Sequence, residues 1–378
     1  MVSGRFTLKG FIDLKYLSEA RYILGVTFVS LVVIYLSRGV KLYKSNTVSI
    51  LFLVSALSFI YILILSSLYS PNKVLAIDKL VDLIFLIILI VGAYFVFKLY
   101  PDYKQIFKVT GFTFLVIGLI YMIPILISIL SGAERGTIYI GGPNVVTRIL
   151  FFALVSSGYL YSLKKQVRYI WFSTLFFIGI VLIGSRGGMV GAFTSLSLFL
   201  LIYILSSRFS LKVIFNKRIV SILVITTPLI IGLSEYFMEV FRERFILLLI
   251  DKIYYSSRDI IYENSLSVIT ESPIIGYGLN AYSSVVGGTF FYPHNIILEI
   301  LIDSGLIGLI PLLIILLFSV ICIFKYTNRS MPFFIILPIY MILVSLLSGD
   351  LYDFRYYFFW VFLILIPLGR YENRYKFE

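Results

Sequence analysis

Charged residues are scarce in this chain, and histidine and cysteine, which often serve in catalytic and metal centres, are almost absent. Only 13% of the 378 residues are charged, and histidine and cysteine occur once each. A single cysteine excludes a disulfide or a cysteine-based metal site within the chain. No group of His, Cys and carboxylate residues has the spacing of metal ligands. We therefore expect no metal ion and no cofactor.

Apolar residues dominate instead. They make up 60% of the sequence, and the mean hydropathy is +1.02. A soluble domain of this length could not bury so much apolar surface. The apolar blocks are about 17–25 residues long, which is the length of helix that crosses a bilayer. We therefore predict an all-α, polytopic transmembrane protein of about 11–12 spans that forms a single domain over residues 1–378.

The predicted spans leave one long loop. The spans are 22–37, 47–69, 79–97, 107–130, 144–163, 169–184, 187–206, 219–236, 305–324, 332–348 and 356–369. Residues 235–304 then form a loop that contains short amphipathic helices. Within it, Ile261, Ser265 and Val268 share a helical face with Ile269. This spacing is typical of a helix that lies at the membrane surface.

The net charge of +13 has a distribution that argues against nucleic-acid binding. Eighteen of the 32 Lys and Arg residues fall in six clusters between apolar blocks: Arg38/Lys41/Lys44, Lys98/Lys104/Lys108, Lys164/Lys165/Arg168, Arg208/Lys212/Lys217/Arg218, Lys325/Arg329 and Arg370/Arg374/Lys376. The clusters occupy alternate loops, which is the positive-inside pattern. It predicts a multi-pass protein of the bacterial cytoplasmic (inner) membrane with loop 235–304 on the periplasmic or extracellular face. The basic N-terminal segment does not fit this alternation.

Several arginines lie between predicted spans or in the outer loop, where positive charges are uncommon. Arg186 stands in "GSRGG" between two predicted spans, and Arg244 and Arg258 lie in the outer loop. Arg186 either anchors the protein at the interface or contacts an anionic ligand. The loop arginines either escape the charge rule, as residues of long loops can, or bind an anion such as phosphate. For Arg148, one turn into a span, anchoring is favoured.

The single histidine, His294, precedes an apolar helical run. Pro293 indicates that the helix begins here, and Asn295, Glu299 and Asp303 recur along it at intervals of four residues. Such a polar stripe predicts a face directed at a watery cavity. A neutral imidazole near pH 7 can accept a proton, so His294 is a candidate general base. An isolated histidine is more often a structural hydrogen-bonding residue, and both interpretations stay open at this point.

Several motifs in order resemble the bacterial O-antigen ligase/polymerase superfamily. His294-Asn295 is followed after nine residues by Gly305-Leu306-Ile307-Gly308, as in the family pattern H-N-x9-G-x-x-G. The segment "SSRDIIYENSLSVITESPIIGYGLNAY" is similar to the approach to that histidine. "GSRGG" and "GGPNVV" are similar to two further elements. The resemblance covers about residues 140–325.

The resemblance implies a metal-independent, inverting transferase that uses a glycan carried on undecaprenyl diphosphate. In an O-antigen or capsular polysaccharide polymerase, the acceptor is the non-reducing end of another lipid-linked repeat unit. His294 would then be the base, and Arg186, Arg258 and Arg244 would bind the diphosphate. Asn295 and Glu299 would complete the substrate site or orient the imidazole. Membrane lipids and a chain-length regulator are further expected partners, and no nucleic acid is.

Two other functions remain open. An O-antigen ligase would transfer the glycan to lipid A-core, and the H-N-x9-G-x-x-G spacing fits it well. A flippase for lipid-linked oligosaccharides would need charged residues along several spans, and most spans here carry none. The chain is short, its outer loop is modest, and its 29 Tyr and 34 Phe residues include aromatics that could stack on sugar rings. We therefore predict a polymerase, with the ligase as the first alternative and the flippase as the second.

Overall fold

The computed structural model describes residues 26, 27, 29, 30, 33, 34, 37, 47–99, 103–131, 142–205, 257–287, 292–326 and 332–374. The span predicted at 219–236 lies outside these residues, and so does most of the span predicted at 22–37. Within the described ranges, all regular structure is helical, which confirms the predicted all-α class.

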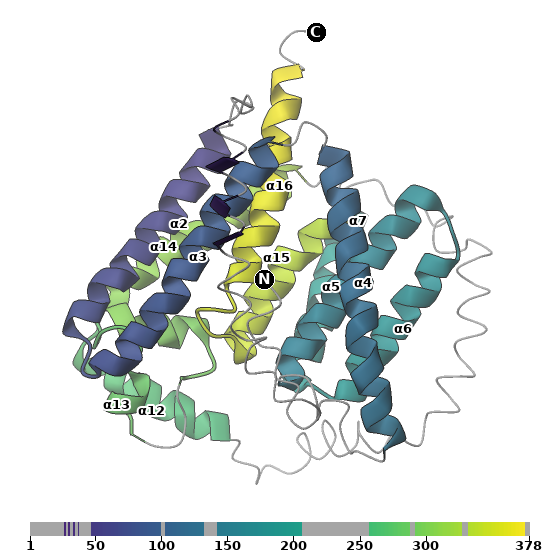
Figure 1. Ribbon diagram of the computed structural model, residues 1–378. Coiled ribbons are helices and arrows are strands. Elements are labelled where there is room, and N and C mark those ends of the chain that lie inside the picture. Colours follow the sequence, from purple (N-terminus) through teal and green to yellow (C-terminus); the bar gives the residue numbers. More distant parts are fainter. Residues whose placement is uncertain are drawn as a thin grey trace.

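The helices in the described ranges are, in chain order, α2 (Thr47–Ser66), η2 (Ser67–Tyr69), α3 (Lys73–Leu99), α4 (Tyr103–Leu130), α5 (Pro143–Lys164), α6 (Arg168–Ile183), α7 (Arg186–Leu205), α12 (Ser257–Glu271), α13 (Tyr282–Val285), α14 (Ile296–Tyr326), α15 (Pro332–Ser348) and α16 (Arg355–Arg374). The long helices run side by side along one direction, and the short helices α12 and α13 lie at one end of them (Figure 1). We call the end at which α3, α5, α14 and α16 begin the lower end, and the opposite end, where α16 ends, the upper end (Figure 1).

Length and apolar composition confirm a helical membrane protein. Four described segments are able to cross a bilayer, and three shorter apolar helices accompany them. The four are Thr47–Tyr69, Lys104–Leu130, Pro143–Lys164 and Ile296–Ile321, and the shorter three are Arg168–Ile183, Phe333–Ser348 and Arg355–Leu365. The total number of spans stays a prediction, because part of the chain lies outside the described residues.

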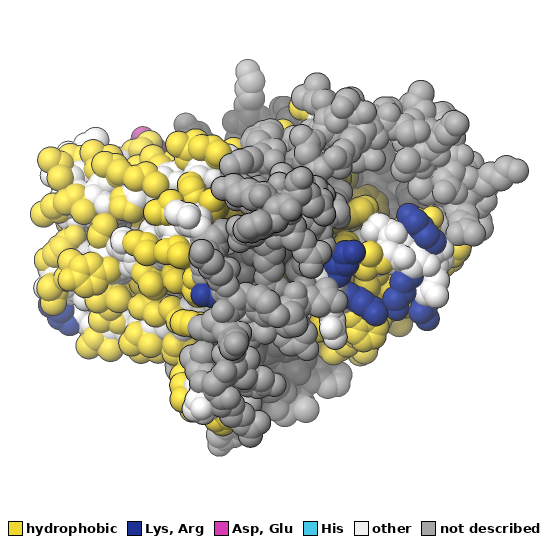
Figure 2. Space-filling model, turned by 90° about the horizontal axis from the view of Figure 1, so that it is seen from above, with side chains coloured by type: hydrophobic (Ala, Val, Ile, Leu, Met, Phe, Trp, Pro, Cys, Tyr) yellow, Lys and Arg dark blue, Asp and Glu magenta, His cyan; other side chains and the backbone are white. Residues whose placement is uncertain are grey.

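The outward faces of these helices are apolar, as a lipid environment requires. On α14 the exposed large side chains recur at helical spacing: Ile307, Ile310, Ile314, Leu317 and Ile321. Viewed from the upper end, one flank of the molecule is almost wholly hydrophobic (Figure 2). The exposed stripe therefore contacts lipid when the protein is in a bilayer.

The two ends of the helices differ in charge. At the upper end, α3 ends near Lys98, α4 begins with Lys104 and Lys108, and the α5–α6 turn carries Lys164, Lys165 and Arg168. The view from above shows Lys and Arg side chains gathered on the side of the molecule away from the apolar flank (Figure 2). Two clusters that the sequence assigned to one face of the membrane therefore lie at one end of the structure.

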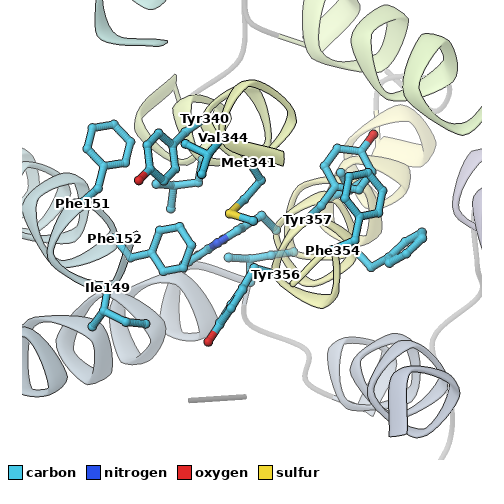
Figure 3. Close-up of a cluster of buried hydrophobic side chains, with 14 of the residues drawn as sticks. Ile149, Phe151, Phe152, Tyr340, Met341, Val344, Phe354, Tyr356 and Tyr357 are labelled. Atoms are coloured by element: carbon cyan, nitrogen blue, oxygen red, sulfur yellow. The ribbon is translucent and has the colours of Figure 1, made fainter. Parts of the chain in front are cut away.

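Aromatic side chains from α5, α15 and α16 form the centre of the core (Figure 3). The rings of Phe151 and Tyr340 are 4.1 Å apart, and those of Phe152 and Tyr356 are 5.4 Å apart. These rings are buried. This packing holds α5 against α15 and α16.

Candidate functional site

His294 lies immediately before the lower end of α14. The next residue, Asn295, caps the helix: its side-chain oxygen accepts hydrogen bonds from the backbone N–H groups of Ile297 (2.9 Å) and Leu298 (3.4 Å). The predicted helix start after Pro293 is thus confirmed. The half-buried imidazole lies 4.2 Å, centroid to centroid, from the ring of Tyr292. His294 has a φ of 57°, which is uncommon for a residue other than glycine.

The polar stripe of α14 faces protein groups rather than water. Glu299 Oε1 lies 2.9 Å from Lys79 Nζ of α3, and Glu299 Oε2 accepts a 2.9 Å hydrogen bond from the backbone N–H of Leu351. Asp303 Oδ1 accepts a 3.3 Å hydrogen bond from the Ala281 N–H. Glu299 and Asp303 are only 4% and 1% exposed. The prediction that this stripe faces a watery cavity is therefore wrong for these two residues, because other helices cover them.

The helix α14 changes direction at Gly305, and a neighbouring loop supplies hydrogen bonds there. Gly305 has φ 59° and ψ −155°, which interrupts the helical pairing. We call residues Pro273–Gly278 the clasp. The pairs between the clasp and α14 are Tyr277 N to Ile302 O (2.7 Å), Gly278 N to Asp303 O (3.0 Å), Leu306 N to Pro273 O (2.9 Å) and Ile307 N to Ile274 O (3.2 Å). Backbone groups that the kink would leave unpaired at membrane depth are thereby satisfied.

Glycine is required on both sides of this contact. Gly276, Gly278 and Gly305 all have positive φ values, of 68°, 102° and 59°. A Cβ atom would approach backbone atoms to 2.6 Å at Gly276, 2.4 Å at Gly278 and 2.3 Å at Gly305. The sequence elements G-x-G and G-x-x-G are therefore explained in large part by close backbone packing rather than by chemistry.

The clasp leads into a segment that is fastened to α2 and α3. The N–H of Leu279 donates to the carbonyl of Ser66 (3.3 Å), and the Ser70 hydroxyl donates to the carbonyl of Leu279 (2.9 Å). Asn280 Nδ2 donates to the carbonyl of Leu75 (3.0 Å). The kink in α14, the helix that follows His294, is thus held against α2 and α3.

The helix predicted in the long loop is confirmed as α12, whereas its position at the membrane surface stays a prediction. Ile261, Ser265 and Val268 are buried, as the shared face predicted, and Ile261 packs in a cluster with Tyr282 and Ile302. Arg258 is the second residue of α12, and its side chain lies outside the described part of the structure. Arg244 lies outside the described residues altogether. The proposed anion contacts of both arginines stay predictions.

The "GSRGG" and "GGPN" segments meet at the lower end. Ser185 accepts a hydrogen bond from the N–H of Gly188 (3.2 Å), which caps α7, and donates its own hydroxyl to Asn144 Oδ1 (2.5 Å) at the start of α5. A Cβ atom on Gly188 would lie 2.6 Å from Thr147 Cγ2, so glycine permits the two helices to approach closely. Arg186 is the first residue of α7, and its side chain is exposed.

We expect Ser185→Ala to lower the free energy of unfolding by about 1 kcal/mol, because it removes both the helix cap and the link to α5. Thermal unfolding of the purified protein in detergent measures this. Ser195→Ala is the matched control, because the Ser195 hydroxyl bonds only the Ala192 carbonyl of its own helix. An equal loss in the two variants would contradict a special role for Ser185.

A charged loop between α15 and α16, residues 348–355, was not predicted from the sequence. Arg148 forms a buried ion pair with Asp353 (2.5 Å) and donates to the Ser348 carbonyl (3.3 Å). Arg355 lies 3.4 Å from Asp353 and has its guanidinium 3.9 Å above the ring of Tyr352. The available signal was the occurrence of Asp350, Asp353 and Arg355 between two apolar blocks.

This loop lies between two parts of the candidate site: the start of α14, which carries Glu299, and the starts of α5 and α7, which Asn144 and Ser185 connect. On one side it contacts Glu299 through the Leu351 N–H, and on the other it contacts Arg148, one turn after Asn144 of α5. Since Asn144 bonds Ser185, contacts run continuously from the histidine helix to the start of the helix that carries Arg186. Among the described residues, no group of three or more His, Cys, Asp or Glu side chains is arranged to hold a metal ion.

Part of the chain also resembles a known protein family. Residues 171–313, from α6 to the middle of α14, match the family described as O-antigen ligase. This match supports the resemblance of the chain to the O-antigen ligase/polymerase superfamily. The members are membrane glycosyltransferase-like enzymes. The match includes Arg186 and His294, whereas Lys79, Arg148 and the 348–355 loop lie outside it. No curated protein matches the chain.

Proposed function

We propose that this protein is a polysaccharide polymerase of the bacterial cytoplasmic membrane. It transfers a growing glycan from undecaprenyl diphosphate to the non-reducing-end hydroxyl of a second lipid-linked repeat unit, with inversion at the anomeric carbon and without a metal ion. The family match over residues 171–313 carries the proposal, because it contains the histidine and the arginines that such a transfer needs.

The placement of His294 supports an active site on the outer face of the membrane. His294 lies at the lower end of the helices, whereas the basic residues of the α3–α4 and α5–α6 connections lie at the upper end. By the positive-inside rule the upper end faces the cytoplasm. Lipid-linked repeat units on the periplasmic or extracellular leaflet would then meet the enzyme at the end that carries His294.

In the proposed reaction, the acceptor hydroxyl oxygen attacks the anomeric carbon of the donor. The bond from that carbon to the diphosphate oxygen breaks, and the diphosphate leaves with the electron pair. His294 accepts the hydroxyl proton, since an unassisted sugar hydroxyl is a weak nucleophile near pH 7. Arg186, Arg258 and Arg244 stabilise the negative charge that grows on the diphosphate.

We assign Asn295 and Glu299 a supporting role in this site. The side-chain oxygen of Asn295 caps α14, and the two carboxylate oxygens of Glu299 contact Lys79 and the Leu351 N–H. These contacts fix the start of the helix that follows His294. We therefore expect the two residues to orient the imidazole rather than to bind sugar directly.

A ligase is the second candidate, and one observation favours it: the matching family carries the description O-antigen ligase. A ligase would use the same donor and the same base, and would differ in its acceptor, lipid A-core. The residues proposed to bind the diphosphate serve both reactions equally well. The acceptor must therefore be identified by experiment.

We expect the purified protein to convert lipid-linked repeat units, supplied alone, into a ladder of longer glycans. The measurement is gel or mass-spectrometric analysis of the glycans released from the lipid. The control is His294→Asn, which should give no ladder. A product that forms only after lipid A-core is added would contradict the polymerase and establish the ligase.

A further inference from the structure

Lys79 lies outside the segment that matches the family, yet it contacts the helix that follows the histidine. Its Nζ atom is 2.9 Å from Glu299 Oε1, and the two side chains are only 10% and 5% exposed. The carboxylates of Asp303 and Asp350 also act on it electrostatically. A lysine buried at this depth is costly unless it is paired. Its burial on α3 is therefore explained by the Glu299 carboxylate that it contacts.

Glu299 is held from two directions. Lys79 of α3 engages Oε1, and the backbone N–H of Leu351 engages Oε2 at 2.9 Å. The loop that carries Leu351 is itself fixed to α5 through the Asp353–Arg148 ion pair. The first turn of α14 thus has its position set by α3 and by the 348–355 loop together.

This first turn determines where the imidazole points. The N–H of Glu299 donates to the carbonyl of Asn295 (3.0 Å), and Asn295 directly follows His294. His294 itself adopts a left-handed backbone conformation with φ 57°. A residue other than glycine keeps such a conformation only where its surroundings impose it. Because the Glu299 N–H bonds the Asn295 carbonyl and Asn295 adjoins His294, a displacement of Glu299 also displaces His294.

We propose that Lys79 is a positioning residue of the transferase site, acting on His294 through Glu299. The inference rests on the proposed function in one respect, namely that His294 is the base. Lys79 does not need to touch substrate. Since a displacement of about 1 Å can lower a rate about 10²-fold, loss of the Lys79–Glu299 contact would reduce turnover more than binding.

The single histidine permits a test that does not depend on activity. The protein, purified through a histidine-free tag and labelled with ¹³C,¹⁵N-histidine, contains one imidazole and gives one set of imidazole NMR signals in lipid nanodiscs. We expect Lys79→Met to shift or broaden these signals, because Glu299 loses the cation that orients it. Lys79→Arg, which keeps the charge, should restore them.

Two control variants separate positioning from general damage. Lys73→Met removes an exposed lysine from the start of the same helix, and it should leave the imidazole signals in place. Phe334→Leu creates a core defect beside Phe107 and Trp360, near the upper end, and should lower thermal stability without moving the signals. Unmoved signals in Lys79→Met, or equal changes in Phe334→Leu, would overturn the inference.

Kinetics complete the test. Lys79→Met should lower kcat about 10- to 100-fold with KM within about threefold of the wild type, and Lys79→Arg should recover most of the loss. A raised KM with an unchanged kcat would overturn the positioning role in favour of substrate binding.

If His294→Asn stays active while Lys79→Met moves the imidazole signals, the proposed function fails and the structural link stands. If His294→Asn is inactive but the signals do not move, only the link fails.

Discussion

Replacing His294 by asparagine or alanine is expected to lower kcat about 10²- to 10⁴-fold, which is the usual contribution of a general base. The physical reason is that the acceptor hydroxyl keeps its proton until a base removes it. His294 is the single imidazole in the chain, so no second histidine can take over the role. The measurement is single-turnover extension of a synthetic lipid-linked repeat unit.

The backbone at His294 decides which variant is most informative. With φ at 57°, alanine introduces strain in addition to removing the imidazole, whereas asparagine tolerates this conformation better. We therefore expect His294→Asn to unfold at nearly the wild-type temperature, and still to be inactive. Activity within a few-fold of the wild type in a folded His294→Asn protein would rule out the histidine as the base.

Replacing Gly305 by alanine is expected to lower the free energy of unfolding by about 3–5 kcal/mol and to reduce the yield of folded protein sharply. Two effects combine at this position. The φ of 59° with ψ of −155° is a conformation that essentially only glycine adopts, and a Cβ atom would lie 2.3 Å from the carbonyl carbon of Ile274. Thermal unfolding and size-exclusion chromatography in detergent measure the loss.

Two glycine controls divide the effect into its parts. Gly287 also has a positive φ, of 70°, but nothing lies within 4 Å of the position of a Cβ atom, so Gly287→Ala should cost only about 1–2 kcal/mol of strain. Gly142 has open space and no positive φ, but it is the N-cap residue of α5, where glycine is preferred to alanine, so Gly142→Ala should cost at most about 1 kcal/mol. Equal stability of Gly305→Ala and Gly142→Ala would contradict the clasp.

The clasp also shows how a motif can be identified correctly from the sequence while its physical basis remains hidden. The H-N-x9-G-x-x-G spacing indicated the family, and the family match confirmed it. The spacing could not show that Gly305 accommodates the Ile274 backbone. That contact joins residues some thirty positions apart in the sequence, so only their packing in space discloses it.

The helix boundaries likewise divide into those that the sequence predicted and those that only the structure showed. Apolar blocks predicted α5, α6, α7 and α15 to within a few residues, because the bilayer thickness requires helices of that length. The span predicted at 79–97 lies within a longer helix, whose first residues, with Lys73, Asp78 and Lys79, are not part of an apolar block. In the structure Asn72 caps the helix through the N–H groups of Val74 and Leu75, and α3 begins at Lys73.

By itself, the sequence determined the all-α membrane class, the helix α12 with its buried face, the helix start after Pro293 and the resemblance to the superfamily. Each of these follows from local composition or from short-range spacing. Only the tertiary structure decided the partners of the buried charges: Lys79 with Glu299, and Arg148 with Asp353. In an apolar interior a charge must be neutralised by whichever opposite charge the packing brings near it, and sequence separation carries no information about that choice.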